Sequence, residues 1–453
     1  MKAGDIIKLD IADIGCNTEG VARCGDIITF VPFVDLGEEI EAEITHINKN
    51  YIFAQKTKLI KASPCRVEPP CVYFEKCGGC DCQHLSYERQ LAHKEKILRD
   101  TLSKFLDVSN INFLPIRYGD KRYGYRNKLQ IPVSAGGGGK AVIGFFEKDS
   151  HKPVDMNSCV LHGEWAAAVI KGVRRYMSEC GVAPYDERSR RGVLRHIVAR
   201  KLGDYLSVTL VINDAKLPKY SKLADIIEYS IRNIDGIKGF SLHYSVNMKN
   251  TNVILGDNIT TVCGYPLAPY EILGIKTRVS PLSFMQINDG VRDMIYQSVA
   301  SLAEGADTVI DAYSGGGALT ALLSKKARTV YGIEIAAEAV ADADGLVKSN
   351  GIQNVKNICG DAADALPSLI ARLKGGVTVV LDPPRKGCEK SVIDALTAAR
   401  CQNIVYISCN PATLARDLSL LSKEYNTVSV EPYDMFPSTK HIETLAYLTL
   451  KAV

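Results

Sequence analysis

No apolar run in this sequence approaches the ~20 residues that a membrane-spanning helix requires. Residues 1–10 alternate and carry charges, which is unlike a secretory signal peptide. A strong excess of one charge is also missing, since the formal net charge is only +4, so global charge does not indicate a nucleic-acid binder. We therefore expect a cytoplasmic chain that makes no contact with a membrane and needs no obligate protein partner.

The sequence is rich in cysteine, with 14 in 453 residues. Because disulfides are rare in the cytoplasm, this number favours metal binding or catalysis for some of them. Others, such as Cys16, Cys263 and Cys401, stand in apolar or strand-like surroundings and are interpreted as small core residues.

The length predicts two or three domains, and the residue patterns change twice along the chain. Short alternating runs over residues 1–60 predict a small β-barrel, and residues 61–265 predict a central α+β domain. Within the latter, residues 87–106 have helical periodicity, and the glycines of 136–139 predict a hairpin tip. Residues 266–453 alternate strands with helices, which indicates a Rossmann-like parallel sheet in a multidomain α/β protein.

The first 60 residues resemble a TRAM domain, a small barrel found on RNA-modifying enzymes. The resemblance is carried by Gly20-Val21-Ala22, Val31-Pro32-Phe33 and Gly37-Glu38. It implies a role in RNA delivery. However, these 60 residues hold six Lys/Arg and ten Asp/Glu, a net charge of −4, so contacts to phosphates must come from a local face or from another domain.

A glycine-rich turn at 314–317 follows a buried strand predicted at 309–312 and precedes a helix. Such a turn lets a ligand approach the backbone at a helix N-terminus. The next strand ends in Glu334, about 20 residues further on, where a carboxylate can accept ribose hydroxyls. These features alone fit a nicotinamide cofactor as well as S-adenosylmethionine.

Asp382-Pro383-Pro384-Arg385 follows the fourth strand of this pattern. Ligands bind at the carboxyl ends of strands in open α/β sheets. An Asp/Asn-Pro-Pro motif there resembles class I methyltransferases that act on nucleobases. Asp rather than Asn favours uracil, since a carboxylate can accept a hydrogen bond from uracil N3–H.

A thiol follows the next strand, in Ser408-Cys409-Asn410-Pro411. C5 of uracil is a poor nucleophile, but a thiolate that adds to C6 pushes electron density onto C5, which can then attack a methyl group. A base must afterwards remove the C5 proton. Glu443, just before the final strand, is the candidate base, and Cys409 is the candidate nucleophile.

Over essentially its whole length the chain resembles the RNA uracil-5-methyltransferases of the RumA/TrmA group. The matching segments are Ser283–Asn288, the glycine loop after Asp311, the Asp382 and Cys409 motifs, and His441-Ile442-Glu443. The resemblance implies catalytic roles for Cys409, Glu443 and Asp382. It also implies an S-adenosylmethionine and target-base pocket lined by Gln286, Tyr313, Gly315, Glu334, Asp361 and Asp382. Asp361 is alternatively a helix cap. Ala318 departs from the Asn of ribosomal-RNA members, which leaves the detailed contacts of the loop open.

Three cysteines follow a C-x5-C-x2-C spacing, at Cys71, Cys77 and Cys80. Cys159 is the candidate fourth ligand. The spacing alone permits zinc or an iron–sulfur cluster, and the family resemblance favours a 4Fe-4S cluster with a structural or RNA-positioning role.

Basic and aromatic residues alternate over 121–128, which is typical of a platform for single-stranded RNA. A second basic cluster lies over 188–200. The candidate RNA-binding residues in these two segments are Arg122, Tyr125, Arg126, Lys128, Arg195 and His196.

The substrate class follows only from the resemblance. The cysteine cluster together with the TRAM-like domain favours 23S ribosomal RNA, at a single-stranded or loop uridine, over transfer RNA. Two other interpretations stay open: a catalytically silent RNA-binding iron–sulfur protein, and a methyltransferase for cytosine C5 or an exocyclic amine.

Overall fold

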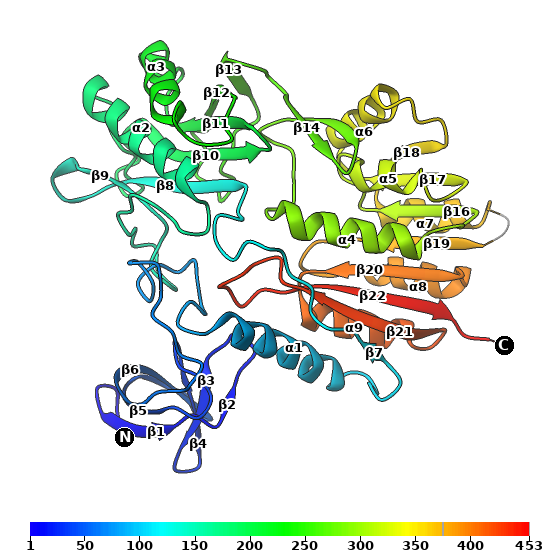
Figure 1. Cartoon of the computed structure of the whole chain (residues 1–453), viewed down its shortest axis with the longest axis horizontal. Coiled ribbons are helices and arrows are strands. Elements are labelled where there is room, and N and C mark those ends of the chain that lie inside the picture. The colour runs from blue at the N-terminus through cyan, green and yellow to red at the C-terminus, as the bar shows by residue number, and fades with distance from the viewer. Residues whose placement is uncertain (374–375, 453) are drawn as a thin grey trace.

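The N-terminal segment folds into a six-stranded sheet around a small core of its own (Figure 1). The computed structural model describes residues 1–373 and 376–452. The strand order is β1-β5-β6-β4-β3-β2, and every pair is antiparallel except β4 with β6. Alternate residues of β5, Ile40, Ala42 and Ile44, are fully buried, so the predicted short strands are confirmed. The strands are β1 (Ile6–Asp10), β2 (Asp13–Ile14), β3 (Gly20–Cys24), β4 (Ile27–Val31), β5 (Glu39–Ile47) and β6 (Tyr51–Lys61).

A second six-stranded sheet follows, in the order β13-β12-β11-β10-β8-β9. Helices α2 (Glu164–Cys180) and α3 (Tyr220–Ile231) share one core with it, which makes the predicted α+β unit. The predicted hairpin tip is a single 3-10 turn, η1 (Gly137–Gly139), between β8 and β9. The strands are β8 (Lys128–Ala135), β9 (Ala141–Ile143), β10 (Leu194–Leu202), β11 (Tyr205–Ile212), β12 (Gly239–Val246) and β13 (Ile259–Cys263). A hairpin of β14 (Ala268–Ile272) and β15 (Ile275–Val279) leads to the last sheet.

The third sheet has the order β18-β17-β16-β19-β20-β22-β21-β7. Its first five strands are parallel and follow the doubly wound pattern, whereas β22 is antiparallel to both neighbours. Helices cover both faces, as the strand–helix alternation predicts. Its strands are β16 (Thr308–Ala312), β17 (Thr329–Glu334), β18 (Val355–Cys359), β19 (Val377–Leu381), β20 (Asn403–Ser408), β21 (Tyr425–Tyr433) and β22 (Glu443–Leu450). Its helices are α4 (Asp289–Leu302), α5 (Ala318–Leu323), α6 (Ala337–Ser349), α7 (Ala362–Ile370), α8 (Lys390–Ala399) and α9 (Pro411–Leu421). No helix in the described parts of the chain has the length and apolar character to cross a membrane.

Two elements from the middle of the chain pack on this third sheet. The predicted helix at 87–106 is α1 (Tyr87–Ser103), and its residues Leu91, Leu98 and Leu102 share a core with α9. The short strand β7 (Asn112–Phe113) pairs with the edge strand β21. Chain order places both in the predicted central domain, but their apolar faces are buried against the C-terminal sheet (Figure 1).

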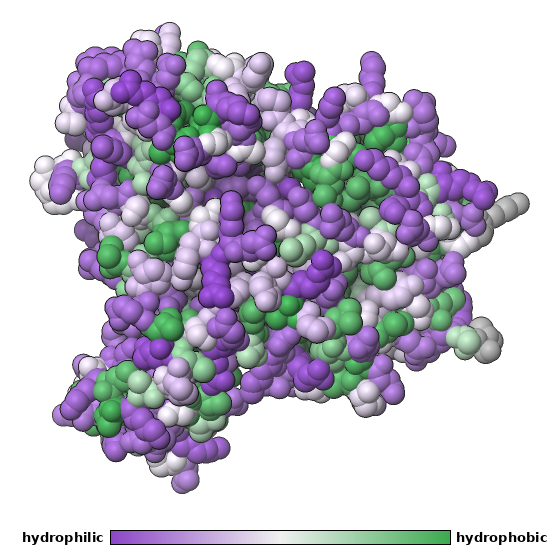
Figure 2. Space-filling model, in the orientation of Figure 1, coloured by the Kyte–Doolittle hydropathy of each residue, from purple (hydrophilic) through white to green (hydrophobic). Residues whose placement is uncertain are grey.

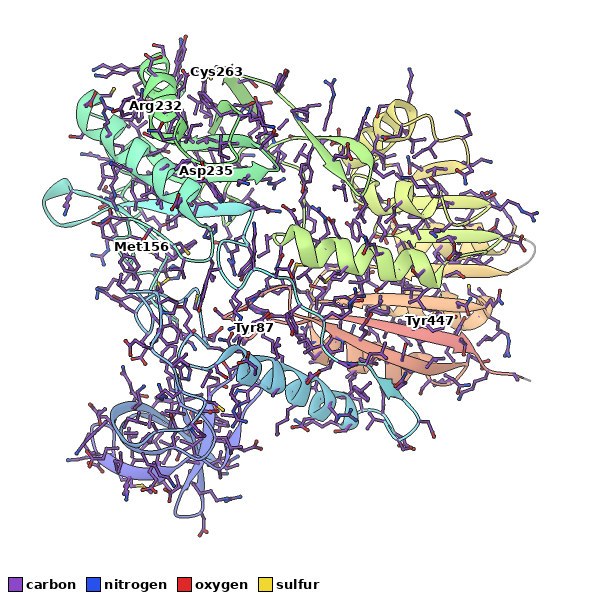
Figure 3. The ribbon with its side chains drawn as sticks, in the orientation of Figure 1. Tyr87, Met156, Arg232, Asp235, Cys263 and Tyr447 are labelled. Atoms are coloured by element: carbon purple, nitrogen blue, oxygen red, sulfur yellow. The ribbon has the colours of Figure 1, made fainter. Side chains whose placement is uncertain are left out.

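A buried ion pair joins α1 to the loop before β22. Lys94 Nζ donates to Asp434 Oδ1 (2.5 Å), and both side chains are at most 1% exposed. Tyr87, labelled at the start of α1 in Figure 3, donates its hydroxyl to Asp434 Oδ2 (2.8 Å). The lysine also donates to the carbonyl of Phe436 (3.0 Å). Because each charge is compensated only by its partners, removal of one leaves the other buried and unpaired.

We predict that Lys94→Met lowers the free energy of unfolding by about 3–5 kcal/mol, because Asp434 then loses its cation. Urea denaturation followed by circular dichroism measures the change. The matched control is Lys96→Met on the same helix, whose side chain is 43% exposed and pairs with Asp13 and Asp100. The control should change stability by about 1 kcal/mol or less. Equal effects of the two substitutions would contradict the role given to the buried pair.

Candidate active site

Three candidate catalytic residues meet at one edge of the third sheet. Asp382 follows β19 and Cys409 follows the neighbouring parallel strand β20. Glu443 is the first residue of β22, which runs antiparallel to β20 with Ser408 opposite Thr444. This register brings the residue after Ser408 beside the residue before Thr444, so Cys409 lies next to Glu443 although the two are far apart in sequence.

The environment of these groups changes their acidity. Burial, then the adjacent charge of Asp382, raises the pKa of Glu443 well above its usual value, and the side chain is only 2% exposed. Desolvation raises the pKa of Asp382 to about 7. Burial, with Glu443 adding to it, raises the pKa of the Cys409 thiol to about 11, while Arg385 opposes this shift. The site thus holds a shielded thiol beside a carboxyl that readily accepts a proton.

The glycine loop after β16 has the backbone conformation that a close-approaching ligand needs. Tyr313, Gly315 and Gly317 have φ values of 69°, 54° and 79°. At Gly317 a Cβ would lie 2.7 Å from Cβ of Ala343 on α6, so only glycine fits. The Gly315 N–H donates to Glu334 Oε2 (3.0 Å), which ties the loop to the end of β17.

The other predicted pocket residues come from neighbouring positions. Asp361 is the N-cap of α7, and its Oδ1 accepts from the Ala363 N–H (2.9 Å), so the helix-cap interpretation holds. It follows β18, next in the sheet to Glu334. Gln286 lies in the segment before α4, where its carbonyl accepts from Asn127 Nδ2 (3.0 Å). Glu334 and Asp361 therefore lie at the same edge of the sheet, whereas Gln286 lies in the segment before α4.

The four predicted cysteine ligands line one cavity of about 110 Å³. Met156, labelled in Figure 3, lines it too. Burial raises the pKa of the thiols of Cys77 and Cys80, and that of Cys159 to about 11, while Arg126 opposes these shifts. In the described part of the chain no three His, Cys, Asp or Glu side chains are close enough to hold a single metal ion. All four thiols line this one cavity, and a set of four thiolates is one that both zinc and an iron–sulfur cluster accept.

The predicted RNA platform, residues 121–128, is exposed over its first half and partly or fully buried over its second. The ring of Tyr125 is buried, and its hydroxyl donates to the Pro437 carbonyl (3.0 Å), so it is not available for stacking on bases. Arg195 is also buried, and its guanidinium donates to the carbonyls of Asn247 and Lys249. Neither side chain is free to contact RNA in this conformation, and their assignment as RNA-binding residues stays a prediction. The alternation of residue types in the sequence does not reveal which side of a segment packs inward.

The other candidate RNA-binding residues differ in exposure and in protonation. Arg122 is exposed, with its guanidinium 4.4 Å from the ring centre of Tyr87. Burial and the charge of Arg200 lower the pKa of Lys128 to about 8. Burial and Arg195 lower the pKa of His196 to about 4, so its ring is neutral near pH 7.

A cleft of about 580 Å³ lies between the cysteine loop and the segment before Glu443. Arg126 lines both this cleft and the cysteine cavity. The lining carries four cationic side chains, three carboxylates and several aromatic rings, among them Arg126, Lys148, Arg385, Lys440, Asp81, Glu147, Asp149, Phe146, Phe436 and His441. Lys440 could have been predicted as a residue of this cleft, because it lies only three positions before Glu443 in the sequence. The sequence gives no such indication for Lys148, because it comes from a distant hairpin.

The comparisons with known proteins agree with this geometry. Residues 274–451 match the family model described as tRNA (Uracil-5-)-methyltransferase. An uncharacterized RNA methyltransferase of Halalkalibacterium halodurans is 37% identical over 453 residues, covering 99% of this chain and 97% of the relative. Another, from Clostridium tetani, is 37% identical over 457 residues, with 99% and 97% covered.

The fold is similar to that of a solved enzyme. The crystal structure of Pyrococcus abyssi tRNA (uracil-54, C5)-methyltransferase, in complex with S-adenosyl-L-homocysteine, superposes with a TM-score of 0.79 at 26% identity. The match covers 98% of this chain and 100% of that one. The predicted multidomain α/β architecture and the predicted activity are thereby confirmed, and the chain belongs to the RNA uracil-5-methyltransferases, which take their methyl group from S-adenosylmethionine.

Proposed function

We propose that this enzyme methylates C5 of its target uridine by covalent catalysis, with Cys409 as nucleophile, Glu443 as general base and Asp382 as the partner of uracil N3–H. The observation that carries the proposal is the register of β20 and β22, which brings the thiol and the buried carboxyl together beside Asp382. A uridine reaches these groups only after it leaves its base stack.

Each group has one task in this scheme. Cys409 Sγ, as the thiolate, adds to C6, and the electron pair placed on C5 bonds to the methyl group that S-adenosylmethionine supplies, with S-adenosyl-L-homocysteine as the leaving group. Glu443 then takes the proton from C5, the C5–C6 double bond forms again, and the thiolate leaves. Burial suits Glu443 to this step, because its raised pKa makes the carboxylate a stronger base. Arg385 favours the thiolate by its charge.

The cofactor pocket is proposed to run along the carboxyl ends of β16, β17, β18 and β19. Glu334 would accept the ribose hydroxyls, since it is held at the glycine loop by the Gly315 N–H. Asp361, at the end of the next strand, would lie by the adenine. Tyr313, Gln286 and Asp382 would complete the pocket.

We propose that the cavity formed by Cys71, Cys77, Cys80 and Cys159 holds a 4Fe-4S cluster. The support for this choice is the cavity of about 110 Å³ that all four thiols line, together with the family resemblance. With four thiolate ligands the cluster would have no open iron at which a substrate or S-adenosylmethionine could bind, and its proposed part is to hold the surrounding loops and the RNA cleft.

The proposed substrate is 23S ribosomal RNA, and the support is the cysteine cavity together with the N-terminal sheet, which we assign to the TRAM type. We propose that the chain divides into domains at 1–60, 61–265 and 266–453. Helix α1 and strand β7 belong to the second by sequence but pack on the sheet of the third. The target RNA would lie in the cleft of about 580 Å³, where phosphates meet cations and unstacked bases meet aromatic rings. Transfer RNA is the second candidate, because the similar Pyrococcus abyssi enzyme acts on it.

We expect Cys409→Ala to abolish turnover, since no other group can add to C6. Glu443→Gln should still form the methylated protein–RNA adduct but fail to release it, because an amide cannot take the C5 proton. Denaturing gel electrophoresis with labelled RNA detects the adduct. Cys263→Ser is the matched control: Figure 3 labels this residue on the central sheet, away from the C-terminal sheet, and its activity should be normal. Normal turnover of Glu443→Gln would rule out its assignment as the base.

Anaerobically purified protein should contain about four iron and four sulfide per chain, which chemical analysis and Mössbauer spectroscopy measure. Cys80→Ser should lose most of this content, because it removes one ligand of the cavity. Cys65→Ser should keep it, since Cys65 does not line the cavity. Zinc in place of iron in protein prepared without oxygen would overturn the cluster.

The substrate is tested by incubation with tritiated S-adenosylmethionine and transcripts of either RNA, followed by nucleoside analysis. We expect labelled 5-methyluridine in ribosomal RNA. Label in transfer RNA alone would keep the chemistry and replace the substrate. Absence of label from both, with the cluster intact, would refute the catalytic proposal.

A further inference from the structure

We propose that Asp81 is a positioning residue for the last step of the reaction, because it connects the cysteine loop to the segment that carries Glu443. This proposal rests on the proposed function, in which Glu443 removes the C5 proton. Asp81 stands between Cys80, which lines the cysteine cavity, and Cys82, and its side chain is 12% exposed. None of the sequence motifs singles it out.

Asp81 holds the distant segment 438–440 by its backbone and its side chain. The backbone N–H groups of Asp81 and Cys82 both donate to the Ser438 carbonyl, at 2.9 and 3.1 Å. In return the Lys440 N–H donates to Asp81 Oδ2 (3.1 Å), across 359 positions of the chain. The other carboxylate oxygen, Oδ1, accepts from Lys148 Nζ (3.3 Å). The carboxylate therefore joins the cysteine loop to the segment 438–440 and to the turn after β9 that carries Lys148.

The segment that Asp81 holds needs such support. Ser438 has a φ of 68°, in the left-handed region that costs a residue with a Cβ about 1 kcal/mol or more. It is 2% exposed, and its N–H donates to Gln90 Oε1 on α1 (3.0 Å). A strained conformation persists only where the surroundings determine it. Glu443 follows Lys440 by three residues. We therefore expect the position of this segment to affect the position of the Glu443 carboxyl at the start of β22.

The other end of the connection is the cysteine cavity. Gln83 Nε2 donates to Cys80 Sγ (3.0 Å), and the Gly78 N–H donates to the Phe146 carbonyl (2.9 Å), so the loop wraps directly around the cavity. Thiols held by one cluster would fix residues 77–82 and with them Asp81. The cluster would thus contribute to catalysis through geometry, by keeping the base in place.

The two halves of the reaction depend on different parts of this arrangement. Addition to C6 and methyl transfer use Cys409, which lies between β20 and α9. Among the described residues, the hydrogen bonds of Asp81 go to Ser438, Lys440 and Lys148 and not to Cys409, although Asp81 lines the same cleft as Arg385. Proton removal uses Glu443. Loss of the Asp81 carboxylate should therefore slow the elimination step selectively, whereas a general loss of folding or RNA binding would slow both halves together.

The experiment compares Asp81→Ala and Asp81→Asn with the wild type, using the full-length holoenzyme and RNA that carries tritium at uridine C5. Release of tritium reports proton removal, and label from S-adenosylmethionine in the trapped adduct reports methyl transfer. Single turnovers at saturating RNA separate these rates from binding. Iron and sulfide are measured for each variant.

We expect Asp81→Ala to release tritium about 10- to 100-fold more slowly, since small displacements of a catalytic group have effects of this size. The adduct should accumulate and the iron content should stay normal. Asp81→Asn should lie between this variant and the wild type, because its amide oxygen still accepts from the Lys440 N–H while the charge facing Lys148 is lost. It also serves as the readout if the alanine variant does not fold. Glu75→Gln, on the same loop but paired with Lys56 at the surface, should match the wild type.

Tritium release at the wild-type rate in both variants would overturn the proposal, and so would equal slowing of methyl transfer and tritium release. Loss of iron in Asp81→Asn would also overturn it, since the residue would then act on the cluster and not on the base. A wild-type enzyme that forms neither adduct nor 5-methyluridine would instead refute the proposed function, so the two failures can be told apart.

Discussion

The antiparallel insertion of β22 between β20 and β21 is the constraint on which the active site depends. In a purely parallel sheet the residues before a strand and those after its neighbour lie at opposite edges. Because β22 runs the other way, the start of this last strand reaches the same edge as the end of β20. Cys409, just after β20, and Glu443, at the start of β22, are therefore neighbours. The hydrogen bonds between the two strands keep them in this register.

Burial gives these two groups their chemical character. A carboxyl that is 2% exposed beside another carboxyl holds its proton more tightly, which makes its ionised form a better base. The same desolvation disfavours the thiolate of Cys409, and Arg385 offsets part of that effect. Arg385 both lines the proposed RNA cleft and opposes the rise in the pKa of Cys409, so in the proposed function one cation would serve the nucleophile and the phosphates of an incoming RNA.

The N-terminal half of the chain supports this edge from outside. Helix α1 is anchored through Lys94 to Asp434, at the beginning of the segment that precedes β22. The cysteine loop contacts the same segment at Ser438 and Lys440. Helix α1 and the cysteine loop thus both contact the segment 434–442, which lies directly before the proposed base.

The sequence by itself determined the local features: strand–helix alternation, a glycine loop, and chemical groups such as Cys409 and Asp382 placed just after strands. These follow from periodicity and turn chemistry, which act over a few residues. The sequence also suggested Cys159 as a partner of the other three cysteines and Glu443 as a partner of Cys409. Only the tertiary structure brings each of them to its partner. The local sequence pattern does not reveal the burial of Tyr125, the packing of α1 on the third sheet or the contact between Asp81 and Lys440. They depend on how whole elements pack, and that packing is fixed by contacts between residues hundreds of positions apart.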